Sequence, residues 1–135
     1  MKKGLIYLGL LFVTTLLLAA CTASSPGEAA KKYAGYIQKG EYEKFADAIA
    51  LDEKATPEDN KKNKEMVVAL LKEKGAKSIE EKGGIKTIEI LSETVSEDGN
   101  TAKVALKQTY GNGDAEDSNF DLVKQDGTWK IVMDK

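Results

Sequence analysis

The chain has 135 residues, and its 22 acidic and 20 basic residues give a formal net charge of −2. It contains a single cysteine and no histidine, and every basic residue is a lysine. A single cysteine excludes an internal disulfide. The absence of histidine removes the commonest metal ligand and near-neutral acid–base group, and the absence of arginine removes the side chain that binds phosphate in a bidentate manner. The weakly acidic charge balance argues against nucleic-acid binding.

The first 20 residues have the pattern of an export signal. Two lysines precede an uncharged apolar run over residues 5–18, and the small residues Ala19 and Ala20 follow it. A membrane-spanning helix needs about 20 apolar residues, so this run is slightly short for one. We therefore predict a cleaved signal peptide over residues 1–20.

The sequence Leu18-Ala19-Ala20-Cys21 resembles the bacterial lipoprotein box. It predicts cleavage between Ala20 and Cys21 and a diacylglycerol thioether on Cys21, because a thiolate is the nucleophile that can take a glyceryl group. Two or three acyl chains hold a protein stably on a membrane, at about 0.8 kcal/mol per buried CH₂. The resemblance to lipoproteins implies that Thr22, in place of an aspartate after the cysteine, directs the protein to the outer membrane in a cell that has one. An ordinary signal with a chance cysteine is the alternative.

Removal of the leader leaves 115 residues, which is the size of one domain, with 18 lysines against 22 acidic residues and a net charge of −4. We predict a lipidated cysteine and short tether over residues 21–25 and one domain over residues 26–135. At about 3.5 Å per residue the tether reaches on the order of 14 Å, so the domain should lie close to the bilayer.

Helices are expected in the first half of the domain. Ser25-Pro26-Gly27-Glu28 combines a capping serine, a proline suited to the first helical position and a capping-box glutamate. Gly40 should end this helix at the position after its C-cap. A second, shorter helix is expected over residues 41–50, folded back on the first.

Thr56-Pro57-Glu58-Asp59 repeats the same start signal. A third helix should run from Pro57 to about Lys74, with Gly75 as its stop. Its first half has no apolar residue and must be solvated. A short further helix over residues 76–82 is compatible with the sequence.

After Gly84 the hydrophobic period changes from 3.6 to 2, which indicates strands. The first strand is expected over residues 85–95, with a bulge where its apolar face switches, and a hairpin turn over residues 97–100 leads to the second. A polar loop from Gly111 to Ser118 precedes a third strand. A fourth follows Asp126-Gly127, and its residues Trp129, Ile131 and Met133 should face inward.

Runs of helices followed by runs of strands indicate the α+β class. We predict three N-terminal helices packed on a curved four-stranded antiparallel sheet.

Three features of the chain together resemble a known family. They are the lipoprotein signal, the Gly40-Glu41-Tyr42 turn and the C-terminal run Lys124-Gln125-Asp126-Gly127-Thr128-Trp129-Lys130-Ile131. In these the chain is similar to small bacterial lipoproteins of unknown function with the nuclear transport factor 2-like (NTF2-like), cystatin-like fold. The resemblance covers residues 26–135 and implies a strongly curved sheet that wraps the helices as a cone, often with a pocket at the open end.

The superfamily that this resemblance implies includes isomerases and dehydratases as well as non-catalytic ligand and partner binders. Its enzymes use a pocket aspartate with a tyrosine or a histidine, and no such motif can be matched residue by residue in this sequence. Fold alone does not transfer function.

Aromatic side chains are the candidates for lining a pocket, because a buried ring with one polar end can orient a small apolar ligand. Ordinary core packing is the alternative use of the same residues. The side chains expected to line the pocket are those of Tyr33, Ile37, Tyr42, Phe45, Tyr110 and Trp129.

Other polar groups are weaker candidates. Asp47 or Asp52 with a tyrosine would form an acid–base pair in a desolvated pocket, although solvated carboxylates are the commoner state. The acidic stretch from Asn112 to Asp117 lacks the spacing of a calcium loop, and we interpret it as a polar hairpin loop. The lysine-rich half of the third helix is interpreted as a solvated face. We predict no catalytic residue, no metal site and no cofactor.

The sequence therefore predicts a lipoprotein of the bacterial cell envelope, held on a membrane through Cys21, that binds a small apolar ligand or a partner protein without catalysis. An enzyme of the isomerase or dehydratase type with a pocket Asp and Tyr is one alternative. A structural or accessory envelope protein is another. Nucleic acid is not an expected partner.

Overall fold

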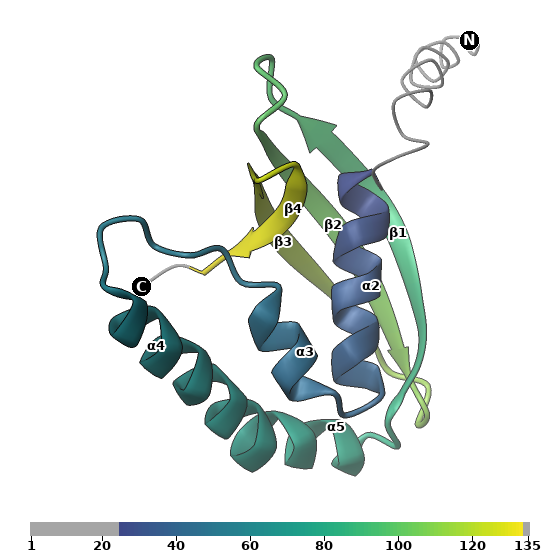
Figure 1. Cartoon of the computed structure of the whole chain (residues 1–135). Helices are drawn as coiled ribbons and strands as arrows, with labels where there is room; N and C mark the ends of the chain where they lie inside the picture. Colours follow the sequence, from purple (N-terminus) through teal and green to yellow (C-terminus); the bar gives the residue numbers. More distant parts are fainter. Residues whose placement is uncertain (1–24, 134–135) are drawn as a thin grey trace, which may run out of the picture.

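The computed structural model describes residues 25–133 (Figure 1). The predicted signal peptide, its cleavage site at Ala20 and Cys21, and the tether up to residue 24 lie outside the described residues. The elements are α2 (Pro26–Gln38), α3 (Tyr42–Asp47), α4 (Pro57–Leu70), the π-helical turn η1 (Leu71–Gly75), α5 (Ala76–Glu81), β1 (Ile85–Val95), β2 (Thr101–Tyr110), β3 (Ala115–Gln125) and β4 (Thr128–Val132).

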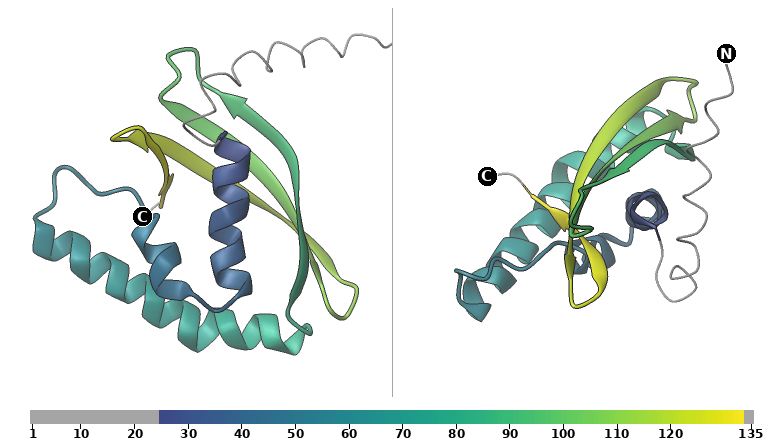
Figure 2. Two further views of the ribbon diagram at one scale, coloured as in Figure 1. Left: turned by 45° about the vertical axis from the view of Figure 1, so that its right-hand side comes forward. Right: turned by 90° about the horizontal axis from the view of Figure 1, so that it is seen from above.

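The four strands form one antiparallel meander in the order β1-β2-β3-β4. The sheet is strongly curved, and α2 lies along one of its faces (Figure 2). The helix α3 follows beside α2, and α4, η1 and α5 run as one long helix across the end of the molecule (Figure 1). The α+β class and the packing of three helices on a four-stranded sheet are thus as predicted.

The core lies between α2 and the concave face of the sheet. On β2 the alternate residues Ala102, Val104 and Leu106 are buried, and their cross-strand neighbours on β3 include the buried Leu122. The small residues Ala30 and Ala34 of α2 let the helix approach these strands closely, and both are buried. Each large aliphatic side chain buried in this way contributes about 1.5–3 kcal/mol.

The predicted start signals form real caps. The Oγ of Ser25 accepts a hydrogen bond from the backbone N–H of Glu28 at 3.2 Å, and Thr56 Oγ1 accepts one from the N–H of Asp59 at 3.0 Å. A carboxylate distant in the sequence adds a bond at the start of α2, where the N–H of Gly27 donates to Glu93 Oε1 at 2.8 Å. A negative charge there is favoured by the helix dipole, and the bond ties α2 to β1.

Gly75 does not end the third helix, which corrects the prediction. The residue keeps helical dihedral angles, with φ at −64°, and the chain passes through η1 into α5 without leaving the helix. The helix ends instead at Gly83 and Gly84, which have φ values of 88° and 81°. Such left-handed values favour glycine, whereas glycine at a helical φ costs only about 1 kcal/mol relative to alanine.

The second helix is shorter than predicted. The helix α3 ends at Asp47, and the next three residues run beside β4 with a parallel bridge between Ile49 and Ile131. The N–H of Ala50 donates to the carbonyl O of Ile131 at 2.7 Å, and the N–H of Ile131 donates to that of Ala48 at 2.8 Å. These bonds to β4 satisfy backbone groups that a continued helix would have paired locally.

The strands largely follow the prediction. The first strand covers residues 85–95, and its register shifts between Ile90 and Ser92, where the bulge was expected. The polar loop between the second and third strands is only four residues long, because β3 already begins at Ala115. Met133 lies beyond the end of β4 and is 46% exposed, so its predicted inward orientation is wrong.

Candidate functional site

The aromatic residues predicted to line a pocket lie mostly in the core. Tyr33, Phe45, Tyr110 and Trp129 are each no more than 8% exposed, and Ile37 and Tyr42 are half-buried. Tyr33 donates its hydroxyl hydrogen to the carbonyl O of Trp129 at 2.5 Å. Burial raises the pKa of Tyr33, and Tyr36 nearby raises this pKa further. Its hydroxyl therefore joins α2 to β4.

Tyr110 belongs to a polar cluster at the end of β2. Its hydroxyl donates to Glu116 Oε1 at 2.9 Å, while Lys82 pairs with the other oxygen of Glu116 and lies 4.8 Å from the tyrosine ring centroid. The pKa of Tyr110 is raised by burial and by its bond to Glu116, and hydrogen bonds from Lys82 and Tyr110 lower the pKa of Glu116. These contacts join the end of α5 to the hairpin between β2 and β3.

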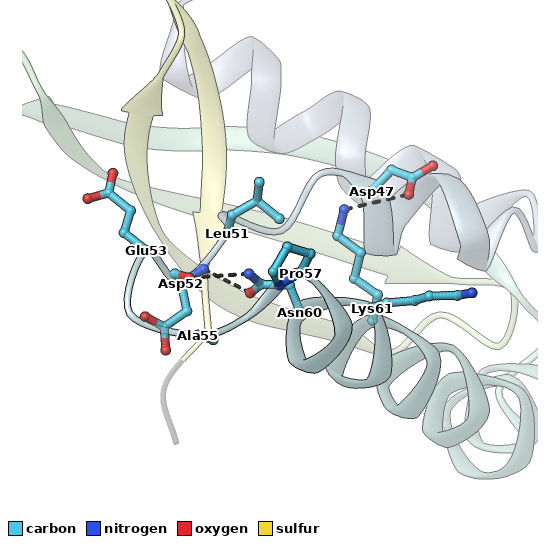
Figure 3. A pocket seen from close by; sticks show the side chains of 9 residues that line it. Asp47, Leu51, Asp52, Glu53, Ala55, Pro57, Asn60 and Lys61 are labelled. Carbon is cyan, nitrogen blue, oxygen red and sulfur yellow. Dashed lines mark hydrogen bonds and ion pairs between the residues drawn. The ribbon is translucent and has the colours of Figure 1, made fainter.

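A groove open to solvent lies elsewhere, between the end of α3, the loop after it and the first turns of α4 (Figure 3). Its volume is about 550 Å³. Apolar atoms make up most of its surface. The lining residues are Asp47, Leu51, Asp52, Glu53, Ala55, Pro57, Asn60, Lys61 and Lys64. The six residues of the predicted pocket are not among them.

Two side-chain amides hold the loop that forms one wall of this groove. Gln125 accepts a hydrogen bond from the N–H of Leu51 and donates to its carbonyl O, both at 3.0 Å. Asn60 accepts from the N–H of Asp52 at 3.0 Å and donates to its carbonyl O at 3.2 Å. Each amide thus pairs with the backbone as a neighbouring strand would, and the wall is held before any ligand arrives.

The opposite wall is one face of α4. Pro57, Asn60, Lys61 and Lys64 recur at helical spacing, so they project on the same side of the helix. Sequence reasoning placed this part of the helix in solvent, and α4 indeed contains no buried residue. The role of Asn60 and Gln125 in holding this loop could not be predicted from the sequence, because an amide side chain in a charged stretch gives no sign of its distant backbone partner.

Both signs of charge line the groove, which has three carboxylates and two lysines. Lys64 Nζ lies 3.8 Å from Asp47 Oδ1, and the Asp47 side chain is 77% exposed. An exposed pair of this kind contributes about 0–1 kcal/mol. Leu51 is 50% exposed and supplies an apolar surface beside these charges. The groove can therefore receive an apolar side chain that is flanked by polar groups.

The polar groups of the groove do not form the acid–base pair considered from the sequence. Asp47 and Asp52 both line it, but no tyrosine is among the lining residues. The tyrosine hydroxyls of Tyr33 and Tyr110 bond to a carbonyl and to Glu116 instead. Among residues 25–133 no group of three His, Cys, Asp or Glu side chains is placed to hold a metal ion.

The helices packed on a strongly curved antiparallel sheet define a small α+β domain. The chain belongs to the family described as Domain of unknown function (DUF4878), whose model matches residues 19–132. A comparison with curated proteins finds no match.

A solved structure shares the fold. It is a Campylobacter jejuni protein described as a candidate NTF2-like transpeptidase, which aligns with a TM-score of 0.71 and 24% sequence identity. The alignment covers 82% of this chain and 100% of the other. At this identity the likeness establishes the NTF2-like fold, and the activity in that description is the other protein's. None of the helices in the described part of the chain is long and apolar enough to cross a membrane.

Proposed function

We propose that the protein is a lipid-anchored envelope lipoprotein whose folded domain binds a partner non-catalytically through the groove. The anchor is supported by the sequence, in which a basic start, an apolar run and the Leu18-Ala19-Ala20-Cys21 box occur in order. Acyl chains on Cys21 would hold the chain on the membrane. The domain would then be free to bind.

The binding proposal rests on one observation, which is that one wall of the groove is already held in place by hydrogen bonds within the domain. Gln125 and Asn60 fix the backbone at Leu51 and Asp52 and so keep the half-exposed Leu51 side chain in the groove. A wall that is already ordered loses little conformational entropy when a partner binds. Because the groove is open at the side, it suits a side chain on a partner protein better than an enclosed small molecule.

The anchor is tested by labelling cells with a radioactive fatty acid. The unmodified chain should take up the label, and the Cys21→Ala chain should lose it and accumulate as a precursor of uncleaved size. A labelled Cys21→Ala chain would overturn the proposed site of attachment.

The groove is tested by photo-crosslinking in intact cells. A photoreactive amino acid at Leu51 and one at Ala55 should each give the same discrete crosslinked product. The matched control is Lys103, whose side chain is 82% exposed and pairs with Asp121. Its neighbours Ala102 and Val104 on β2 are buried, so Lys103 lies on the face of the sheet that points away from the core. Equal crosslinking from position 103, or no product from positions 51 and 55, would contradict binding at the groove.

A further inference from the structure

Apolar side chains are exposed along the second half of β1. Ile88, in the first half of the strand, is 9% exposed, whereas Ile90, Leu91 and Val95 are 38%, 49% and 45% exposed. We call these three residues the β1 patch. The strand is an edge of the sheet, because within the sheet it pairs with β2 alone. The apolar residues of β1 therefore become less covered from its beginning to its end.

The β1 patch lies beside the first turn of α2. The N–H of Gly27 donates to Glu93 Oε1 at 2.8 Å, and a Cβ added at Gly27 would lie 3.2 Å from Cγ2 of Ile90. At the other end of the helix, Gln38 Nε2 donates to the carbonyl O of Ile85 at 3.0 Å. The helix and the strand therefore run in opposite directions, and β1 ends where α2 begins (Figure 1).

Two residues of the patch project from the face of the sheet that carries α2. Residues directly opposite each other in an antiparallel pair share one face. Ile90 lies opposite Leu106 and Val95 lies opposite Ala102, and both partners are buried in the core. Leu91 lies at the shift in register. The patch is thus the end of the core-facing surface, which α2 leaves partly uncovered.

The proposed anchor decides which surface lies near the patch. Four residue steps separate Cys21 from Ser25, so the membrane lies within about 14 Å of Ser25. Ser25 caps α2, and Gly27, two residues further on, contacts the patch. The long helix, which carries the exposed Leu70, lies at the opposite end of the molecule (Figure 1).

Charge does not select the occupant, because both signs border the patch. Glu93, Glu97 and Asp98 are exposed on or just after β1, and the exposed Lys31 follows Gly27 by one turn of α2. Charged side chains are costly inside the hydrocarbon layer of a membrane. A contact between the patch and a bilayer is therefore shallow, at the level of the headgroups.

We propose that the β1 patch rests on the phospholipid surface to which Cys21 is anchored. The proposal rests on the anchor given under the proposed function, and it adds the orientation of the domain. The acyl chains hold the protein on the membrane, whereas three half-exposed side chains fix which end of the domain faces the lipid. This orientation keeps the groove between α3 and α4 clear of the bilayer.

The test is site-specific photo-crosslinking of the full chain in intact cells grown with radioactive phosphate. A photoreactive diazirine amino acid at Leu91 should capture phospholipid and so transfer the phosphate label to the chain. The diacylglyceryl group of the anchor contains no phosphate and adds no label. The matched control is Leu70, which is as exposed as Leu91 but lies on the long helix. We expect several-fold more label from position 91 than from position 70.

Equal labelling from positions 91 and 70, or a protein captured at position 91 in place of lipid, would overturn the proposal. A radioactive fatty acid, given to the same cells without irradiation, separates this failure from a failure of the anchor. If the chain takes up no fatty acid, the anchor is wrong and the contact is wrong with it. If the chain is acylated and position 91 captures no more lipid than position 70, the contact alone is wrong.

A charge placed in the patch gives a second readout. Val95→Glu should lower the phosphate label captured at position 91 several-fold, because a carboxylate opposes contact with lipid. Met66→Glu, at a position on the long helix that is 60% exposed, is the matched control and should leave the label unchanged. Both replaced side chains are exposed, so neither change disturbs the core. Capture at position 91 that is insensitive to Val95→Glu would contradict the proposed contact.

Discussion

Asn60 and Gln125 show how two neutral side chains shape the candidate site. Each uses both the donor and the acceptor of its amide on the backbone of one loop residue, Asp52 or Leu51. These bonds take the place of a ladder partner on a stretch that has left the sheet. The groove wall is thus built by residues that need not touch a ligand themselves.

Replacing Asn60 by alanine tests this role. Two hydrogen bonds to Asp52 are lost, and each contributes about 0.5–1.5 kcal/mol net. We expect the free energy of unfolding to fall by about 1–2 kcal/mol and the amide hydrogen of Asp52 to exchange faster. Asn60→Asp keeps an acceptor for that N–H but loses the donor, so its effect should be intermediate. Unchanged exchange at Asp52 in Asn60→Ala would contradict the account.

Tyr33 gives a prediction on alkaline stability. Because burial raises the pKa of Tyr33, the folded chain holds the phenolic proton more tightly than the unfolded chain does. Its contribution is fully present below the unfolded pKa of about 10 and is lost as the pH rises through the folded pKa. The hydrogen bond to Trp129 adds about 0.5–1.5 kcal/mol while the phenol is protonated.

We therefore expect Tyr33→Phe to lower the free energy of unfolding at neutral pH by about 0.5–1.5 kcal/mol. The gap between the two chains should narrow as the pH rises above about 10. Denaturant unfolding at a series of pH values measures both quantities. A gap that is constant or widens with pH would show that Tyr33 does not hold its proton in this way.

At the scale of elements, backbone hydrogen bonds join the hairpin between β2 and β3 to the residues that follow α5. The N–H of Gly111 donates to the carbonyl O of Gly84 at 2.8 Å, and the N–H of Asn112 donates to that of Lys82 at 2.9 Å. A Cβ added at Gly111 would collide with the carbonyl O of Gly83. The hairpin between β2 and β3 can approach the end of α5 so closely because glycine stands at the contact.

Gly111→Ala should accordingly lower the free energy of unfolding by about 1–3 kcal/mol, the usual cost of overpacking. Gly35→Ala is the matched control, since Gly35 lies within α2 and a Cβ there would meet nothing within 4 Å. That control should raise stability by about 0.5–1 kcal/mol through helix propensity. Thermal unfolding of the two variants distinguishes them, and equal effects would contradict the close contact.

The elements also show which features local sequence can predict. Ser25 and Thr56 start helices through bonds to residues three positions on, so the pattern alone sufficed. The prediction at Gly75 was wrong because whether a glycine ends a helix depends on the residues after it, and here Ala76 continues into α5. The early end of α3 depends on β4, which lies more than 80 residues further along the chain.

The position of the candidate site could not be predicted for the same reason, since it depends on contacts between elements that are distant in the sequence. Aromatic residues such as Tyr33 and Trp129 were identifiable as apolar positions, but periodicity cannot say whether a ring fills a core or lines a cavity. The groove arises where α3, the loop at Leu51 and α4 meet, and Gln125 reaches it from β3. Contacts between elements that are distant in sequence are not encoded in any local pattern.

At the scale of the whole molecule, the fold presents two surfaces away from the start of α2, where the proposed tether would join (Figure 1). The groove beside α3 and the outer face of the long helix occupy different faces of α4, with Lys61 and Lys64 on one and Met66 and Leu70 on the other. A chain held by the proposed anchor would therefore leave both surfaces open to solvent.

Intact-mass spectrometry of the protein purified from the cell envelope tests most directly that this domain works from a lipid anchor. We predict a mature chain that begins at Cys21 and carries the added mass of a diacylglyceryl group, with or without a further acyl chain on the new amino terminus. A chain with an unmodified Cys21 thiol, or with residues of the leader still attached, would contradict the account.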